Sequence, residues 1–396
     1  MAKSITKKFV AISLTILMVM MGLPMDVFAE ATRSTETFAS PEETINVASS
    51  DLADGRSINF NSDWKFYKGS VSNGQSNSLD DSSWRTLDLP HDWSIEGNFT
   101  TQGEAESGFL LGGTGWYRKT FKLSEEYKNK NISIEFGGVY MNCTVYVNGT
   151  ELGTHPYGYT PFAFDLTKYL KYDGTNNVIA VKVNHQVPSS RWYSGSGIYR
   201  DVNLVVTDNV HVKRYGTKVT TPNLASEKGG NVDVNIETEV KNEENSSASV
   251  TVKNTVYNSS NEAVSTTVSK DATIGANSES TISQSTSVNN PSLWSTDSPT
   301  LYYVKTQVVK DGNVIDEYTT NFGFRYFNFN RSTGVSLNGQ KMKLKGVCMH
   351  HDQGALGSVA NYNAIERQVK KLKQMGANAI RVTHNPASDE LLEICN

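Results

Sequence analysis

The stretch that decides the fold is MKLKGVCM at residues 342–349, followed by NAIERQVKKLKQMG at 363–376 and ANAIRVTH at 377–384. The first and last segments are short and rich in apolar residues, as β-strands are. The middle segment places apolar side chains on one stripe of a helix and ends at Gly376, a residue that commonly terminates helices. The stripe consists of Ile365, Val369, Leu372 and Met375. Strand, helix and strand in this order predict a parallel βαβ unit, and hence the first two strands of an α/β domain.

Short strands separated by turn residues fill the chain upstream of this unit. From residue 56 onward, β-branched and aromatic runs are bounded by Gly, Asn or Asp, and no helical period is sustained. The clearest runs are ISIEFGGV (132–139), CTVYVNG (143–149), NVIAVKVN (177–184) and DVNLVVTD (201–208). This pattern predicts a β-sandwich of about 150 residues.

A second pattern begins near residue 208, where apolar and polar side chains alternate and Ser, Thr and Asn become frequent. The alternating apolar residues include Val232, Val234, Ile236, Val250 and Val252. A period of two predicts strands with one buried face. We therefore predict a second, smaller sandwich of the immunoglobulin type over 208–327, with the α/β segment over 328–396.

The N-terminus has the layout of a secretory signal peptide. Lysines precede the apolar run FVAISLTILMVMMGL at residues 9–23, and Val27 and Ala29 occupy the −3 and −1 positions of a cleavage site. A membrane anchor is the alternative, but the run is shorter than the ~20 residues that a spanning helix needs. We therefore predict a signal peptide over 1–29 and a polar linker over 30–55. The mature protein is then expected to be secreted or at the cell surface, with no transmembrane segment.

Charge, cysteine count and aromatic content indicate which kinds of partner the protein can bind. The formal charge is −4 and the basic residues are spread along the chain, so we predict no nucleic-acid partner. Three cysteines are too few for a disulfide framework, so the exported protein must depend on ordinary hydrophobic cores. Aromatic residues make up 10% of the chain, which suits contact with carbohydrate as well as with protein.

Six motifs occur in an order that matches these predicted domains. They are LPHDW (89–93), GTGWYRKTF (113–121), VYVNG (145–149), SRWYSGSGIYRDV (190–202), KGVCMHHDQGALG (345–357) and NAIRVTHNPAS (378–388). Together they resemble glycoside hydrolase family 2, specifically its exported β-galactosidase branch. The resemblance implies a jelly-roll sugar-binding domain over 56–207, the immunoglobulin-like domain, and over 328–396 the truncated N-terminal part of a catalytic (β/α)₈ TIM barrel.

The end of the first barrel strand carries polar residues. Side chains alternate along a strand, so adjacent His350 and His351 cannot both face the same side. Polar residues at the C-terminal end of a barrel strand belong at the mouth of the active site. We predict that His350 and Asp352 line a sugar pocket. The alternatives are a polar cap on the barrel, and a metal site made of His350, Asp352 and His384, which no common ligand spacing supports.

The end of the second strand repeats this arrangement. The resemblance implies that His384 contacts the sugar near the transition state and that Arg381 helps to hold the catalytic carboxylates. A structural salt bridge of Arg381 is compatible with that role. Pro386 disfavours helical backbone at Asn385, which is expected to fix the Asn385 amide at the rim of the pocket.

The sandwich offers two further substrate-binding candidates. The resemblance places a pocket residue just before the Trp of LPHDW, which is Asp92 here. The Gly- and Ser-rich loop after residue 188 bears Arg191, Trp192 and Tyr193, whose guanidinium and aromatic groups suit a sugar edge. For Trp192, packing between domains is an equally weighted alternative.

Catalysis itself is expected to need residues beyond these. Retaining glycoside hydrolysis uses two carboxylates, a nucleophile and an acid/base. The resemblance places both glutamates at the ends of later barrel strands, beyond Asn396, so the sequence is expected to be an inactive N-terminal fragment of a β-galactosidase. The resemblance allows a divalent or sodium ion, and no definite cofactor is predicted. The alternatives are a carbohydrate-binding or adhesion module without catalysis, and a β-glucuronidase or β-mannosidase of the same family.

Overall fold

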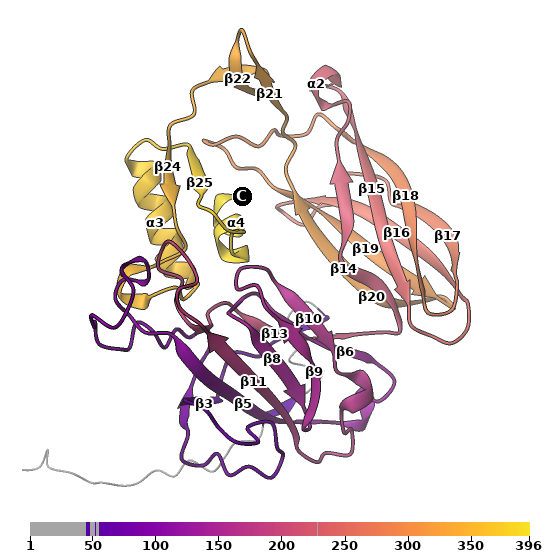
Figure 1. Cartoon of the computed structure of the whole chain (residues 1–396). Helices are drawn as coiled ribbons and strands as arrows, with labels where there is room; N and C mark the ends of the chain where they lie inside the picture. The colour runs from indigo at the N-terminus through magenta and orange to yellow at the C-terminus, as the bar shows by residue number, and fades with distance from the viewer. Residues whose placement is uncertain (1–44, 48–51, 53–54, 228) are drawn as a thin grey trace, which may run out of the picture. The chain divides into compact units, whose positions relative to one another are not determined.

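The computed structural model describes residues 45–47, 52, 55–227 and 229–396 (Figure 1). The signal peptide predicted over 1–29 lies outside the described residues, as does most of the predicted linker. Within that linker, Ile45–Val47 form strand β1, which pairs in parallel with a strand of the first sandwich. The linker prediction is wrong at these residues, because the Val47 side chain is buried in the core. Among the described residues, no helix is long and apolar enough to cross a membrane.

The first sandwich consists of two sheets, antiparallel except for the parallel pairing of β1, and a short extra strand pair. One sheet has the order β4-β3-β5-β11-β8-β9, with β1 also on β5; the other has the order β10-β6-β13-β2; and β7 pairs with β12. The strands are β2 (Ser57–Asn59), β3 (Trp64–Lys68), β4 (Arg85–Leu87), β5 (Gly113–Leu123), β6 (Asn131–Phe136), β7 (Val139–Tyr140), β8 (Cys143–Val147), β9 (Thr150–His155), β10 (Phe162–Asp165), β11 (Asn177–His185), β12 (Gly197–Ile198) and β13 (Val202–Thr207). Short 3₁₀ turns lie at Ala105–Ser107, Glu125–Tyr127 and Thr167–Tyr169.

Alternation of side chains builds the core of this sandwich. In β6 every second residue is buried, and β8 shows the same pattern, so each strand turns one face to the opposite sheet. The inward residues of these two strands are Ile132, Ile134, Phe136, Cys143, Val145 and Val147. Because every second residue of a strand must be apolar to fill this core, the sequence shows a period of two here and no helical period.

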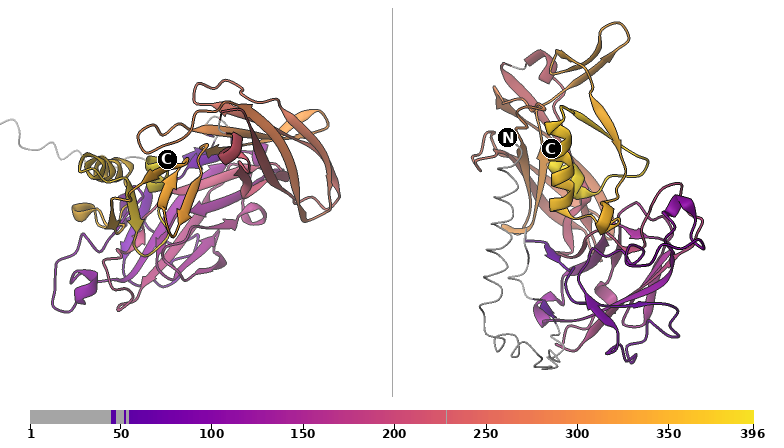
Figure 2. Two further views of the ribbon diagram at one scale, coloured as in Figure 1. Left: turned by 90° about the horizontal axis from the view of Figure 1, so that it is seen from above. Right: turned by 90° about the vertical axis from the view of Figure 1, so that its left-hand side faces the viewer.

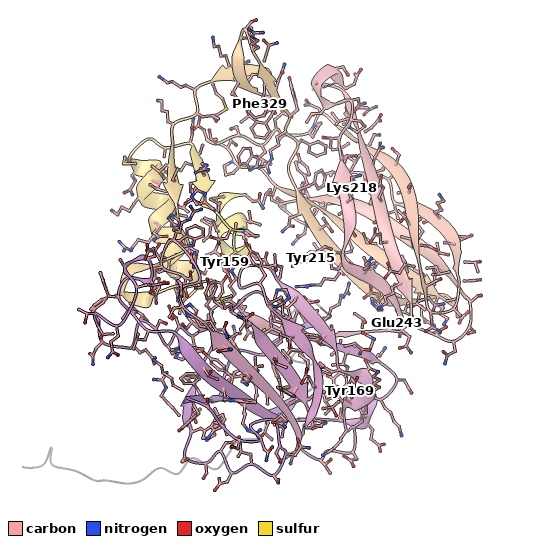
Figure 3. The ribbon with its side chains drawn as sticks, in the orientation of Figure 1. Tyr159, Tyr169, Tyr215, Lys218, Glu243 and Phe329 are labelled. Carbon is pink, nitrogen blue, oxygen red and sulfur yellow. The ribbon has the colours of Figure 1, made fainter. Side chains whose placement is uncertain are left out.

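The second sandwich begins with β14 and has one sheet of order β14-β15-β18 and another of order β17-β16-β19-β20. Its elements are β14 (Val210–Thr220), α2 (Leu224–Glu227), β15 (Asn231–Asn242), β16 (Ala248–Asn258), β17 (Val268–Ile274), β18 (Ser278–Asn289), β19 (Tyr302–Lys310) and β20 (Asn313–Phe322). The apolar residues that alternate in the sequence, including Val232, Val234 and Ile236, are buried between the sheets. In Figure 3, the labelled Lys218 and Glu243 belong to this sandwich.

The α/β segment follows a small sheet of three strands. These are β21 (Phe327–Asn330), β22 (Gly334–Leu337) and β23 (Gln340–Met342). The segment then comprises β24 (Gly346–Met349), a 3₁₀ turn at Gly354–Leu356, α3 (Tyr362–Gln374), β25 (Ala379–Val382) and α4 (Asp389–Cys395). Strands β24 and β25 pair in parallel, as the βαβ prediction requires. Both views of Figure 2 show α3 and α4 next to each other, and the two helices are in contact.

The structure differs from the βαβ prediction in two details. The strand predicted over 342–349 is divided, because Met342 pairs within β23 and only Gly346–Met349 pair with β25. The apolar stripe of the helix also ends early: Ile365 is buried and Val369 packs beside it, whereas Met375 is 68% exposed. Helix α3 stops at Gln374, so Met375 lies at its C-terminal cap, where no neighbour covers it.

Candidate active site

The ends of β24 and β25 place their histidines side by side. Met349 and Val382 are register partners at the ends of β24 and β25. Because the strands are parallel, the residues that follow them emerge at the same edge of the sheet. The rings of His350 and His384 accordingly lie with centroids 5.8 Å apart and nearly perpendicular planes. The parallel pairing that the βαβ pattern predicts therefore brings these two strand ends together.

The first sandwich contributes Trp192 to this cluster. The Trp192 ring centroid lies 5.2 Å from that of His350 and 5.4 Å from that of His384. The Trp192 indole donates a hydrogen bond from Nε1 to Tyr159 Oη at 3.0 Å. Trp192 thus packs between the two parts of the chain, and its partly buried ring also forms a wall beside both histidines.

Adjacent residues His350 and His351 face different partners, as strand geometry predicts. His351 turns toward the sandwich, where its Nε2 donates to the Ser194 carbonyl at 3.3 Å and its ring meets that of Tyr159 at 5.4 Å. Burial lowers the pKa of His351 to about 4. His351 and Tyr159 were not predicted as site residues. The His-His pair at the strand end was the sequence signal for His351, whereas no sequence signal was found for Tyr159.

Acid is expected to destabilise the protein through His351. Its pKa in the folded chain is about 4, below the ordinary value of 6.5, so the unfolded chain binds more protons between these pH values. Stability that is present above pH 6.5 is therefore lost as the pH falls toward 4. His185, whose pKa burial also lowers to about 4, acts in the same direction. Thermal unfolding across this range should show a shallower decline for H351Q, whose amide can still donate to Ser194; an unchanged decline would contradict this.

Arg381 lies on the open face of the strand pair. Arg381 and Cys348 are register partners, and the Arg381 Nη1 lies 3.7 Å from the Cys348 sulfur. Both residues are exposed, whereas Met349 and Val382 pack against the helices on the other face. Among the described residues no salt bridge of Arg381 is present. The guanidinium is therefore available to carboxylates on that face, and its predicted role in holding the catalytic carboxylates stays a prediction.

Asp352 and Asn385 differ in exposure. Asp352 is exposed just beyond His350, where a carboxylate can meet a ligand. Asn385 is only 7% exposed, and its Nδ2 donates to the Pro386 carbonyl at 3.3 Å. The prediction that the Asn385 amide lies at the rim is wrong, because the backbone turn directs this side chain inward. It lines a small pocket of about 20 Å³ together with His350 and Ser358.

The two sandwich candidates also differ from each other. Arg191 is exposed on the loop that carries Trp192, so a sugar contact there stays a prediction. Asp92 is 2% exposed. Its carboxylate accepts hydrogen bonds from the backbone N–H groups of Ser94, Ser196 and Ser358, and from the hydroxyls of Tyr193 and Ser358. Protein donors therefore occupy the acceptor positions that the predicted sugar hydroxyl would need.

The alternative metal site is not formed. Within the part of the chain that the structure describes, no group of three or more His, Cys, Asp or Glu side chains is arranged to hold a metal ion. His350 and His384 approach each other ring to ring, with Trp192 against both. The three rings form one aromatic cluster, in which His384 is exposed and His350 and Trp192 are partly buried.

Comparison with family models gives three matches along the chain. Residues 81–208 match the sugar-binding domain of glycosyl hydrolases family 2, and residues 210–325 match the family 2 domain that follows it. Residues 331–396 match the TIM barrel domain of the same family. The predicted fold class, two sandwiches followed by the first part of a TIM barrel, is confirmed by these matches.

Individual relatives agree with the family models. The chain is 43% identical over 340 residues to the β-galactosidase BoGH2A of Bacteroides ovatus, covering 85% of this chain and 39% of the relative. It is 39% identical to a putative β-glucuronidase of Formosa agariphila, with 85% and 32% covered. A crystal structure of a family 2 member from Bacteroides cellulosilyticus superposes with a TM-score of 0.82 and 39% identity, covering 86% of this chain and 44% of that one. The chain thus spans less than half the length of these relatives.

Proposed function

The chain belongs to glycosyl hydrolases family 2. From that premise we propose that it is part of an exported enzyme, and that this enzyme hydrolyses terminal β-D-galactosides with retention of configuration. The observation that carries the proposal is the cluster of His350, His384 and Trp192. Two strand ends of the barrel and one loop of the sugar-binding domain bring these three rings into contact.

Each residue of the cluster has a defined task in this proposal. The imidazoles of His350 and His384 hydrogen-bond to sugar hydroxyls, and the Asp352 carboxylate accepts from hydroxyl groups with the added strength of its charge. The Trp192 ring covers the apolar face of the pyranose. The nucleophile and the acid/base are assigned, by family resemblance, to glutamates of later barrel strands, with carboxyl groups about 5–5.5 Å apart as retention requires.

A β-glucuronide is the second candidate substrate. Several relatives bear the name β-glucuronidase, among them the putative enzyme of Formosa agariphila. Arg191 and Arg381 are both exposed, and a guanidinium binds a carboxylate through two parallel hydrogen bonds. We favour the galactoside because the BoGH2A sequence is the more similar of the two relatives.

Substrate choice is tested in a protein that includes the whole barrel. The kcat/KM for 4-nitrophenyl β-galactoside should exceed that for the corresponding β-glucuronide and β-mannoside at least tenfold, which corresponds to a transition-state preference of about 1.4 kcal/mol. A preference for the glucuronide would replace the proposed substrate with the second candidate. Binding of galactose without turnover of any aryl glycoside would favour a carbohydrate-binding module instead.

Export is part of the same proposal. The charged, apolar and small-residue order at the N-terminus supports cleavage after Ala29. We expect the secreted protein to begin near Glu30, as N-terminal sequencing of material from the medium or the cell surface would show. Recovery of an extracellular protein that still begins at Met1 would contradict this.

A further inference from the structure

Asp92 joins three segments that are distant in the sequence. Its Oδ1 accepts from the N–H of Ser94 at 2.9 Å and from the N–H of Ser196 at 2.8 Å. Its Oδ2 accepts from the Tyr193 hydroxyl at 2.5 Å and from the N–H of Ser358 at 2.9 Å. Ser196 belongs to the loop that carries Trp192, and Ser358 belongs to the loop after the first barrel strand. One buried carboxylate therefore connects the sandwich loop to the barrel loop.

Two glycines allow the backbones to approach this carboxylate closely. A Cβ atom at Gly195 would lie 2.6 Å from the Asp92 Oδ2, and one at Gly357 would lie 2.3 Å from it. Both glycines have positive φ angles, +70° and +64°, which side chains rarely adopt. The loop backbones are thus shaped around the Asp92 carboxylate, which leaves no space for a sugar hydroxyl.

Arg200 makes a corresponding connection to the second barrel strand. Its guanidinium is buried and donates from Nη2 to the Pro386 carbonyl at 2.8 Å and from Nη1 to the Ala387 carbonyl at 3.4 Å. The same guanidinium donates to the Gly137 and Tyr159 carbonyls of the sandwich. Arg200 therefore ties the turn that directly follows His384 to the sandwich.

We propose that Asp92 and Arg200 are positioning residues that hold the two barrel loops against the sandwich, so that Trp192 lies against both His350 and His384. Asp92 holds the sandwich loop that carries Trp192 and the loop that follows β24, and Arg200 holds the turn beyond His384. The sandwich thus fixes the place of Trp192 beside both histidines without using either charged group as a sugar ligand. The positioning role stands on the contacts alone, and its effect on turnover rests on the proposed function.

The D92N variant tests the positioning role in the 396-residue chain. The amide is nearly isosteric, but one of its two ends is an NH₂ group that must face a backbone N–H. Hydrogen exchange followed by mass spectrometry should become at least tenfold faster in residues 353–360, or in 191–197 if the amide takes the other orientation. Strands β5 and β11 should exchange as in the wild type. Unchanged exchange in both loops would overturn the proposal.

A milder variant and a matched control accompany D92N. S358A removes one hydroxyl donor to Asp92 and keeps the backbone hydrogen bond, so it should show a smaller acceleration confined to 353–360. If D92N fails to fold, the S358A variant alone tests the positioning role. Hydrogen exchange of residues 353–360 at the wild-type rate in S358A would then overturn the proposal. D88N is the control, because Asp88 is exposed and accepts from the N–H of Asp63. It should leave both loops unchanged.

Kinetics in a protein with the whole barrel distinguish positioning from sugar contact. If Asp92 positions the loops, D92N should lower kcat/KM by the same factor for an aryl β-galactoside and for its 2-, 3-, 4- and 6-deoxy analogues. If Asp92 binds one hydroxyl, the analogue lacking that hydroxyl should be insensitive to D92N, and this result would overturn the proposal. Absence of galactoside turnover in the wild type would refute the proposed function, while the exchange experiment would still decide the positioning role.

Discussion

A polypeptide of these 396 residues is expected to release no nitrophenol from 4-nitrophenyl β-galactoside above a buffer blank. Retaining hydrolysis requires two carboxylates on opposite sides of the scissile bond. The described α/β segment has one parallel strand pair, β24 and β25, whose ends carry histidines, an aspartate and an asparagine. The strand ends thus provide a single aspartate, Asp352, and no pair of carboxylates at the separation that retention needs.

The packing of the α/β segment supports this expectation. A groove of about 310 Å³ lies along α3, β25 and α4, and its lining includes Leu372, Ile380 and Leu392. In a complete barrel, eight strands close and the interior fills with layers of side chains. With one strand pair, the open strand edges favour association rather than a closed active site.

The test compares this polypeptide with the full-length BoGH2A relative as a positive control, both purified from a host without β-galactosidase. Size-exclusion chromatography would show whether the polypeptide self-associates. Turnover that copurifies with the monomeric polypeptide and is lost in H384A would refute the expectation.

Loss of the Asp352 carboxylate is expected to weaken transition-state binding by at least ~2 kcal/mol, because a hydrogen bond to a charged group contributes about 1.5–3 kcal/mol. In a protein with the whole barrel, D352A should therefore lower kcat/KM for an aryl β-galactoside about 30-fold. H384A should act similarly, since the proposed function assigns His384, which lies against Trp192, to the same sugar.

Steady-state kinetics with D297A as the control would check this second prediction. Asp297 is an exposed aspartate in a loop of the second sandwich, so its removal should leave kcat/KM within twofold of the wild type. Wild-type kcat/KM in both D352A and H384A would show that these residues lie outside the sugar pocket.

Patterns within short segments predicted most of the fold. The alternation through Val232, Val234 and Ile236 predicted strands with one buried face, and these residues are buried between the sheets. The apolar runs around α3 predicted a parallel strand pair, and the structure pairs β24 with β25 in parallel, which brings His350 and His384 together. Such inferences succeed because helix and strand periods, and the direction of parallel strands, depend on local geometry alone.

The sequence by itself thus determined the two sandwiches, the βαβ unit and the adjacency of its two strand ends. Only the tertiary structure decided the partners of Asp92, the inward turn of Asn385 and the place of Trp192. Asp92 and Ser358 are 266 residues apart, and no period or turn signal links them. Burial of a carboxylate depends on which donors surround it, and those donors come together only when the sandwich packs against the barrel strands.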